Sequence, residues 1–157
     1  NRISKLVVNS LFGTVSGKKI SILGFSFKAN TNDTRNSPSI KICKDLLDEG
    51  ALLSIYDPKV DKVQIENDLN ILNFDNSLNN PLDSFIYAES IEKSIQDSHA
   101  ILILTEWKEF NKINWQIMFK KMKRPAWIFD TRSIIDIKEV ESFGFNVWQV
   151  GNKSFDN

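Results

Sequence analysis

The sequence predicts an α/β protein in which a doubly wound, mostly parallel sheet lies between two layers of helices. Short apolar segments alternate with amphipathic helical segments along the chain, as in successive βαβ units. The apolar segments are rich in Ile, Leu, Val and Phe and lack a clean polar alternation, which is typical of parallel strands covered on both faces. A chain of 157 residues, 41% of them hydrophobic, is long enough to bury one core.

Five segments have the length and composition of such strands: 19–24, 52–56, 100–104, 126–129 and 145–149. Helical periodicity predicts helices in the first dozen residues and over 39–49, 86–94, 115–122 and 137–143. Three of these helices are expected to stop at glycines, namely Gly13, Gly50 and Gly144. Residues 61–85, rich in Asn, Asp, Leu and Ser, exceed an ordinary connection and form either a functional excursion or a loosely ordered segment.

The turn after the first predicted strand, residues 24–39, is the most informative segment. It lies where an open α/β sheet presents its ligands, between the carboxyl end of a strand and the start of a helix. Ser37 is suited to cap that helix and Pro38 to occupy its first position. Two cations, Lys28 and Arg35, accompany the backbone donors of the helix start, so the turn suits an anionic ligand.

A third cation, Arg132, follows the strand predicted at 126–129. Because the carboxyl ends of parallel strands share one edge of a sheet, Arg132 and Lys28 are expected to lie on the same edge. Other interpretations stay open: Lys28 as a solvated loop lysine, Arg35 as the partner of Asp33, and Arg132 as a surface arginine paired with Asp130 or Asp136.

Composition excludes several classes of protein. The 20 basic and 20 acidic residues give no net charge, which argues against a general footprint for nucleic acid or anionic membrane. No apolar run approaches the ~20 residues of a membrane span, and no secretory signal opens the chain. The single cysteine, Cys43, excludes an internal disulfide and fits a reducing cytoplasm, and with the single histidine, His99, it cannot form a zinc site.

A dinucleotide fingerprint is missing after the first strand. Gly24 is followed by Phe-Ser-Phe, which does not match Gly-x-Gly-x-x-Gly. The sheet is therefore predicted to be Rossmann-like without holding its own NAD. Cys43 lies among apolar residues of the helix at 39–49, a setting that indicates a core residue and not an activated thiol.

Four motifs in the chain resemble one family. Residues 27–38 read Phe-Lys-x-x-Thr-x-Asp-x-Arg-x-Ser-Pro, and they are followed in order by Ile-Tyr-Asp-Pro-Lys-Val (55–60), Leu-Thr-Glu-Trp (104–107) and Phe-Asp-Thr-Arg (129–132). Together these motifs resemble the carboxyl-terminal, UDP-binding domain of the UDP-glucose/GDP-mannose dehydrogenase family over nearly the whole chain. Within that family the sequence is most similar to the members that oxidise UDP-glucose.

The resemblance implies a domain organisation. Residues 1–13 would be the end of an inter-domain helix from missing upstream domains, and residues 14–157 a nucleotide-sugar-binding domain with a variable insertion near 61–85. The start at Asn1-Arg2, without an initiator methionine, also indicates a fragment. The full enzyme is expected to be a cytoplasmic homo-oligomer whose partners are the UDP-sugar and its own amino-terminal and central domains, with no role for nucleic acid or membrane.

The resemblance also implies an activity. The whole enzyme would be an NAD-dependent oxidoreductase of polysaccharide biosynthesis that converts UDP-glucose to UDP-glucuronate in two hydride transfers, through a thiohemiacetal and a thioester on a cysteine. That cysteine and the main NAD-binding fold would lie outside this chain, so the fragment alone is expected to be inactive. Sister enzymes acting on UDP-N-acetylmannosamine or GDP-mannose are the nearest alternative.

Residue roles follow from the same likeness. Phe27, Lys28 and Arg132 match substrate-binding residues, and Arg35 matches a residue that reaches the NAD cofactor. The family's usual Asp-Gly-Arg-Asn is changed here, because Thr131 replaces the glycine and Ser133 the asparagine.

A stand-alone regulatory module such as a receiver domain is a different kind of alternative. Asp57 follows a strand, as a phosphoacceptor would, but the first strand ends without the acidic pair that receivers need.

Overall fold

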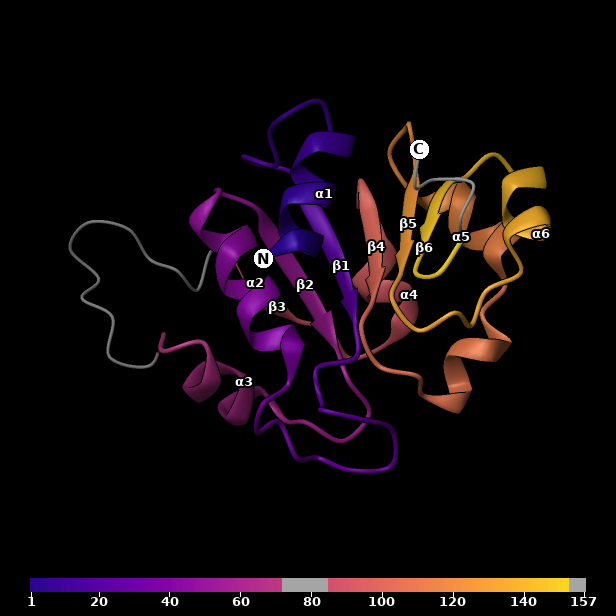
Figure 1. Cartoon of the computed structure of the whole chain (residues 1–157). Coiled ribbons are helices and arrows are strands. Elements are labelled where there is room, and N and C mark those ends of the chain that lie inside the picture. The colour runs from indigo at the N-terminus through magenta and orange to yellow at the C-terminus, as the bar shows by residue number, and fades with distance from the viewer. Residues whose placement is uncertain (72–84, 153–157) are drawn as a thin grey trace.

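The computed structural model describes residues 1–71 and 85–152 and contains one six-stranded sheet (Figure 1). The strands are β1 (Lys19–Leu23), β2 (Leu52–Tyr56), β3 (Phe85–Tyr87), β4 (Ala100–Ile103), β5 (Trp127–Asp130) and β6 (Asn146–Gln149). Their order is β3-β2-β1-β4-β5-β6, and every neighbouring pair is parallel. The order reverses between β1 and β4, as in a doubly wound Rossmann-like fold, so the predicted fold class is confirmed.

The helices form a layer on each face of this sheet. They are α1 (Arg2–Ser10), α2 (Pro38–Asp48), α3 (Lys62–Asp68), α4 (Ile91–Ile95), α5 (Trp115–Lys121) and α6 (Ile137–Ser142), with a 3₁₀ helix, η2, at Lys108–Lys112. One buried cluster contains residues of α1, α2 and α3, and the other contains residues of α4, α5 and α6. Figure 1 shows α1 and α2 in front of the strands and α4 behind them.

The central strand β4 explains why the strands read as continuous apolar runs. Ala100 and Leu102 pack in the cluster under α1 and α2, whereas Ile101 and Ile103 pack in the cluster on the opposite face. All four residues of β4 are fully buried. A strand covered on both faces needs an apolar side chain at each position, so an alternating pattern is absent.

The predicted helix over 86–94 is wrong at its start. Phe85–Tyr87 instead forms the edge strand β3, paired in parallel with β2, and the helix α4 begins only at Ile91, where Ser90 accepts a hydrogen bond from the backbone N–H of Lys93 at 3.0 Å. A strand of three residues is too short to show a period of two, so Ile86 and Tyr87 fit the helical pattern equally well.

The segment at 61–85 contains one further element that the sequence reading missed. Residues Lys62–Asp68 form α3, capped by the side chain of Asp61, which accepts from the N–H of Gln64 at 2.9 Å. The expectation for the remainder of this segment, 72–84, lies outside the described residues.

The predicted ends of the helices agree closely with the structure. Ser37 caps α2 and Pro38 is its first residue, as expected. Gly50 and Gly144 follow α2 and α6 with φ of +87° and +111°, values that favour glycine. The first helix, α1, ends at Ser10, before Gly13.

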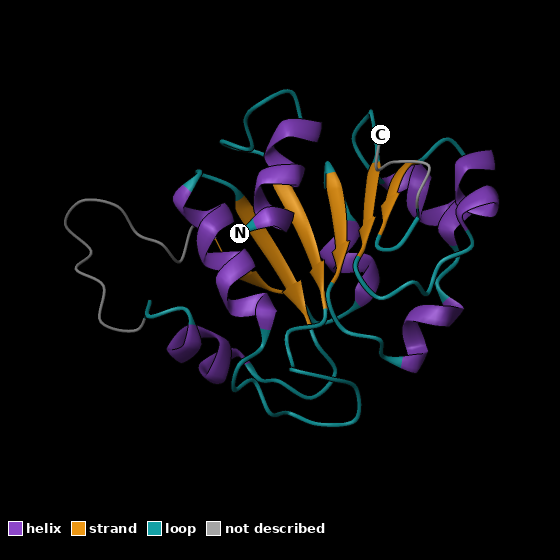
Figure 2. Ribbon diagram, in the orientation of Figure 1, coloured by secondary structure: helices purple, strands orange, loops and turns teal. Residues whose placement is uncertain are grey.

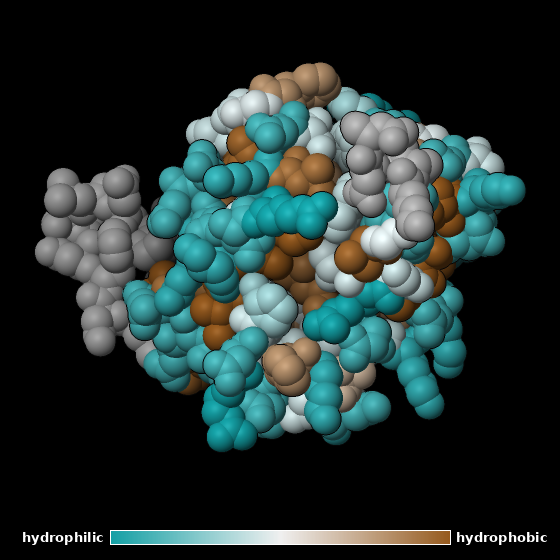
Figure 3. Space-filling model, in the orientation of Figure 1, coloured by the Kyte–Doolittle hydropathy of each residue, from teal (hydrophilic) through white to brown (hydrophobic). Residues whose placement is uncertain are grey.

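The face seen in Figure 3 is mostly hydrophilic, with separate apolar areas between the polar side chains. Within 1–71 and 85–152, no helix has both the length and the apolar character that crossing a bilayer requires.

Candidate functional site

The loops that follow β1, β2, β4 and β5 meet at the carboxyl edge of the sheet, the edge to which the strand arrows point in Figure 2. Phe27 and Lys28 lie in the loop after β1, and Arg132 lies in the loop after β5. The guanidinium Nη2 of Arg132 donates to the carbonyl oxygen of Phe27 at 3.4 Å, across the end of β4. Arg132 and the Phe27–Lys28 segment therefore share one edge, as the parallel topology predicts.

Arg132 is anchored by several groups at once. Its Nε donates to the carbonyl of Leu104 at 3.0 Å and lies 3.4 Å from Oε2 of Glu106, and its backbone N–H donates to Asp130 Oδ1 at 3.0 Å. Its side chain is 29% exposed. The ion-pair partner of the guanidinium is thus Glu106, whereas the carboxylate of Asp136 caps α6. The contacts made by Nε and Nη2 fix the plane of the guanidinium.

Lys28 and Phe27 lie at the open side of this edge. Both residues are exposed, Phe27 to 46% of its surface. The ammonium of Lys28 makes no hydrogen bond or ion pair with any residue of the described ranges, although it lies close enough to help lower the pKa of Asp33. A compact cation and an aromatic face are therefore presented next to the anchored guanidinium.

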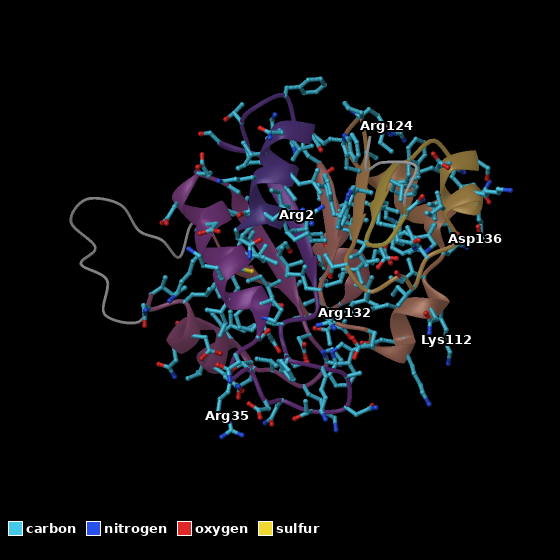
Figure 4. The ribbon with its side chains drawn as sticks, viewed as in Figure 1. Arg2, Arg35, Lys112, Arg124, Arg132 and Asp136 are labelled. Atoms are coloured by element: carbon cyan, nitrogen blue, oxygen red, sulfur yellow. The ribbon has the colours of Figure 1, made fainter. Side chains whose placement is uncertain are left out.

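Arg35 is arranged differently. Its Nε and Nη2 donate to the two carboxylate oxygens of Asp33 at 3.0 and 2.9 Å, and its side chain is 86% exposed. Hydrogen bonds from Arg35 lower the pKa of Asp33 to about 2. Figure 4 places Arg132 beside the strand ends and Arg35 at the outer rim of the loops, pointing away from the protein. The pairing with Asp33 that the sequence left open is the one that the structure adopts.

Asp57 is a central residue of this edge that sequence reasoning considered only as a phosphoacceptor. Its Oδ2 accepts from the N–H groups of Phe25 and Ser26 at 2.8 and 3.1 Å and from the indole N–H of Trp107 at 3.2 Å. Its Oδ1 accepts from the N–H groups of the two residues that end the Tyr-Asp-Pro-Lys-Val motif, at 2.9 and 3.0 Å. Asp57 is 3% exposed, and a buried carboxylate with both oxygens engaged does not favour phosphoryl acceptance or the receiver alternative.

Asp130, the last residue of β5, has the same role for the loop that follows this strand. It is fully buried, and its Oδ2 accepts from the N–H groups of Ile134 and Ile135 at 2.8 and 3.0 Å and from the side chain of Gln149 at 3.0 Å. Together with the bond from its Oδ1 to the N–H of Arg132, these contacts fix the loop that carries the guanidinium.

The substituted positions of the Asp-Thr-Arg-Ser turn are accommodated without strain at Thr131. The hydroxyl of Thr131 donates to the carbonyl of Ile103 at 2.7 Å, and Thr131 has no positive φ. The left-handed conformation falls at Ser133, with a φ of 58°. A glycine is therefore not required where threonine replaces it.

The Leu-Thr-Glu-Trp motif joins the remaining loops. The hydroxyl of Thr105 donates to the carbonyl of Ser26 at 3.0 Å, and a Cβ added to Gly24 would lie 2.4 Å from the Cβ of Thr105. Gly24 also has a φ of +97°, so only glycine permits this approach. The carboxylate of Glu106 accepts from the N–H of Ala29 at 3.3 Å. These contacts explain why the Leu-Thr-Glu-Trp residues are needed at this edge, which the sequence alone did not show.

Neither the cysteine nor the histidine adds chemistry to this edge. Cys43 is fully buried in α2, and burial raises the pKa of its thiol, which confirms its reading as a core residue. Burial also lowers the pKa of His99, which lies just before β4. Within the part of the chain that the structure describes, no cluster of three His, Cys, Asp or Glu residues could hold a metal ion.

The four motifs that build this edge fall within one family model. Residues 21–137 match the model of the UDP-glucose/GDP-mannose dehydrogenase family, UDP binding domain. The chain belongs to this family. The match begins inside β1 and ends at the start of α6, so the UDP-binding-domain assignment covers Lys28, Arg35 and Arg132 as well as the aspartates that hold their loops.

Curated relatives agree with this UDP-binding-domain assignment. UDP-glucose 6-dehydrogenase 4 of Arabidopsis thaliana is 40% identical over 161 residues, covering 96% of this chain and 33% of the relative. UDP-glucose 6-dehydrogenase of Drosophila melanogaster is 41% identical over 152 residues, covering 97% of this chain and 32% of the relative. The chain thus spans about a third of the length of these relatives.

Solved structures carry the same fold. An NDP-N-acetyl-D-galactosaminuronic acid dehydrogenase from Methanosarcina mazei Go1 superposes with a TM-score of 0.72 at 21% identity, covering 96% of this chain and 28% of the other. A UDP-D-ManNAc dehydrogenase from Pyrococcus horikoshii gives a TM-score of 0.68 at 27% identity, covering 93% and 28%. The first of these likenesses, below 25% identity, supports the fold alone.

Proposed function

We propose that this UDP-binding domain serves an NAD-dependent UDP-glucose 6-dehydrogenase and positions the UDP-sugar with Phe27, Lys28 and Arg132. One observation carries the proposal: the guanidinium of Arg132 reaches across the end of β4 to the carbonyl of Phe27, so two cations from distant motifs flank one open edge. The similarity to UDP-glucose 6-dehydrogenases at about 40% identity supports the choice of sugar nucleotide.

The residues are suited to different parts of such a ligand. Arg132 presents a planar, permanently charged fork, which suits a diphosphate or a pair of hydroxyl groups. Lys28 supplies a compact ammonium that can follow a phosphate oxygen or a sugar hydroxyl. Phe27 offers an exposed aromatic face beside them. The contribution of these residues is to orient the substrate and not to make or break its bonds.

The same edge does not fit a dinucleotide of its own. In a dinucleotide fold the N–H groups of the turn after β1 point to the pyrophosphate, but here those of Phe25 and Ser26 are bonded to Asp57. The NAD, which would accept the hydrides, is therefore assigned to upstream domains, with Arg35 as the contact from this chain. The catalytic cysteine is assigned there as well, because Cys43 is buried. We assign α1 to the end of the helix that connects those domains.

Calorimetric titration tests the ligand assignment. The chain is titrated separately with UDP, UDP-glucose and GDP-mannose, and we expect the two uridine nucleotides to bind and the guanosine nucleotide not to bind. An Arg132→Ala variant with an unchanged thermal midpoint is expected to lose that binding. Preference for GDP-mannose would move the proposal to the sister enzyme, and binding that ignores Arg132 would refute the site.

A further inference from the structure

Glu106 lies at the candidate site, but the proposed function assigns it no role. It follows β4, the strand between β1 and β5, and its carboxylate contacts a loop on either side. Its Oε1 accepts from the N–H of Ala29 at 3.3 Å, and its Oε2 lies 3.4 Å from Nε of Arg132. One carboxylate thus links the backbone just after Lys28 to the guanidinium of Arg132.

The contacts of Arg132 define which part of the guanidinium remains available. Nε donates to the carbonyl of Leu104 and forms an ion pair with the carboxylate of Glu106, and Nη2 donates to the carbonyl of Phe27. Among the described residues, nothing accepts a hydrogen bond from Nη1. The guanidinium is held by one edge, and the Nη1 edge is left for a ligand.

Glu106 is the only charged group among these anchors. The carbonyls of Leu104 and Phe27 can orient an N–H donor, but they do not offset the charge of a partly buried guanidinium. A carboxylate does both. Yet a negative charge beside an anion site also repels the ligand, and this cost is useful only if orienting Arg132 matters more.

We propose that Glu106 is a positioning residue that holds Arg132 and the Lys28 turn in the geometry that receives the UDP moiety. The proposal rests on the proposed function for the identity of the ligand, but not for the orientation of Arg132. The proposal predicts that removing the negative charge of Glu106, although it lies next to the bound anion, weakens UDP binding. An effect of charge alone predicts the opposite sign.

Glu109 provides a matched control. It lies on η2 near the same edge, but its carboxylate accepts from the hydroxyl of Tyr56 at 2.6 Å and makes no contact with Arg132. Glu106→Gln and Glu109→Gln therefore remove the same charge and nearly the same volume from one short segment. Only the first removes an anchor of Arg132.

The first measurement needs no ligand. The chain has four arginines, so the ¹⁵N-labelled Nε–H signals are few, and that of Arg132 is identified by its loss in Arg132→Lys. We expect the Arg132 signal to shift and to exchange faster with water in Glu106→Gln, and to stay unchanged in Glu109→Gln. Thermal midpoints close to that of the unsubstituted chain verify that both variants are folded. An unchanged Arg132 signal in Glu106→Gln overturns the proposal.

The second measurement is a titration of each protein with UDP. Glu106→Gln is expected to bind roughly tenfold more weakly, the size of one lost contact to a charged group. Glu109→Gln is expected to bind as tightly as the unsubstituted chain or slightly more tightly. Equal or tighter binding by Glu106→Gln refutes the positioning role. If the Arg132 signal responds to Glu106→Gln while no protein binds UDP, Glu106 still positions Arg132 and the ligand assignment fails instead.

Discussion

The loop after β5 and the loop after β1 each present an arginine at the same edge of the sheet, but they hold it in opposite ways. Arg132 is bonded to groups from three segments of the chain and is 29% exposed. Arg35 is bonded to Asp33, two residues away, and is 86% exposed. The loop after β5 holds its guanidinium in a fixed position, whereas in the outer part of the loop after β1 the guanidinium of Arg35 is held by Asp33 alone.

The two supporting aspartates are expected to show the largest difference. Asp130→Ala leaves the N–H groups of Arg132, Ile134 and Ile135 without their buried acceptor, so the free energy of unfolding should fall by about 3 kcal/mol. Asp33→Ala removes an exposed ion pair and one exposed hydrogen bond from the backbone N–H of Arg35, which water can replace, so the urea midpoint should hardly move. Urea unfolding followed by circular dichroism measures both. Equal losses would show that the two loops do not differ in how they are held.

Ligand affinity should separate the two arginines next. Arg132→Ala and Lys28→Ala are each expected to weaken UDP binding by about 1.5–3 kcal/mol, or roughly ten- to over a hundredfold, since each removes a charged donor. Arg132→Lys should not restore binding, because an ammonium cannot copy a fork. Arg35→Ala should leave UDP binding nearly unchanged and act on NAD affinity in the full-length enzyme. Calorimetric titration with each ligand measures these affinities. A large loss of UDP affinity in Arg35→Ala would show that Arg35 and Arg132 belong to the same binding site.

The smallest expected effect is a pH dependence confined to the Arg35 region. Hydrogen bonds from Arg35 lower the pKa of Asp33 from 3.8 to about 2. A carboxyl group with a lowered pKa in the folded state stabilises the fold above its unfolded pKa of about 3.9 and loses that contribution as the pH falls towards about 2. The unfolding free energies of the chain and of Arg35→Ala should therefore differ slightly at pH 5 and converge near pH 2.

Asp45 is the internal control for that experiment. Its pKa is also lowered to about 2, chiefly by a hydrogen bond from Lys41, and it lies on α2. Arg35→Ala leaves this contribution in place, so some acid sensitivity should persist in the variant. A difference between the two proteins that grows below pH 4 would contradict the assignment to Asp33.

Much of this edge could be predicted from the sequence, because parallel topology alone brings the ends of distant strands together. The convergence of Lys28 and Arg132 needed only the positions of two apolar runs. The short edge strand at Phe85–Tyr87 could not be found in this way, since three residues carry no period. The roles of Asp57, Asp130 and Glu106 were also hidden. In the sequence these acidic residues look like ordinary residues at the ends of strands or in turns. Most of the groups that they bind become their neighbours only in the folded sheet.

The carboxylate of Asp57 stands where a dinucleotide fold would bind the phosphate of its ligand. Its carboxylate takes the N–H groups after β1 that a dinucleotide fold offers to a phosphate, so the domain can be complete at its switch point with nothing bound there. A carboxylate that is covalently part of the chain cannot dissociate, so these N–H groups keep their acceptor whether or not a ligand is bound. A chain carrying Asp57→Gly should consequently become dependent on dissolved anions, with a thermal midpoint that rises as acetate or phosphate is added.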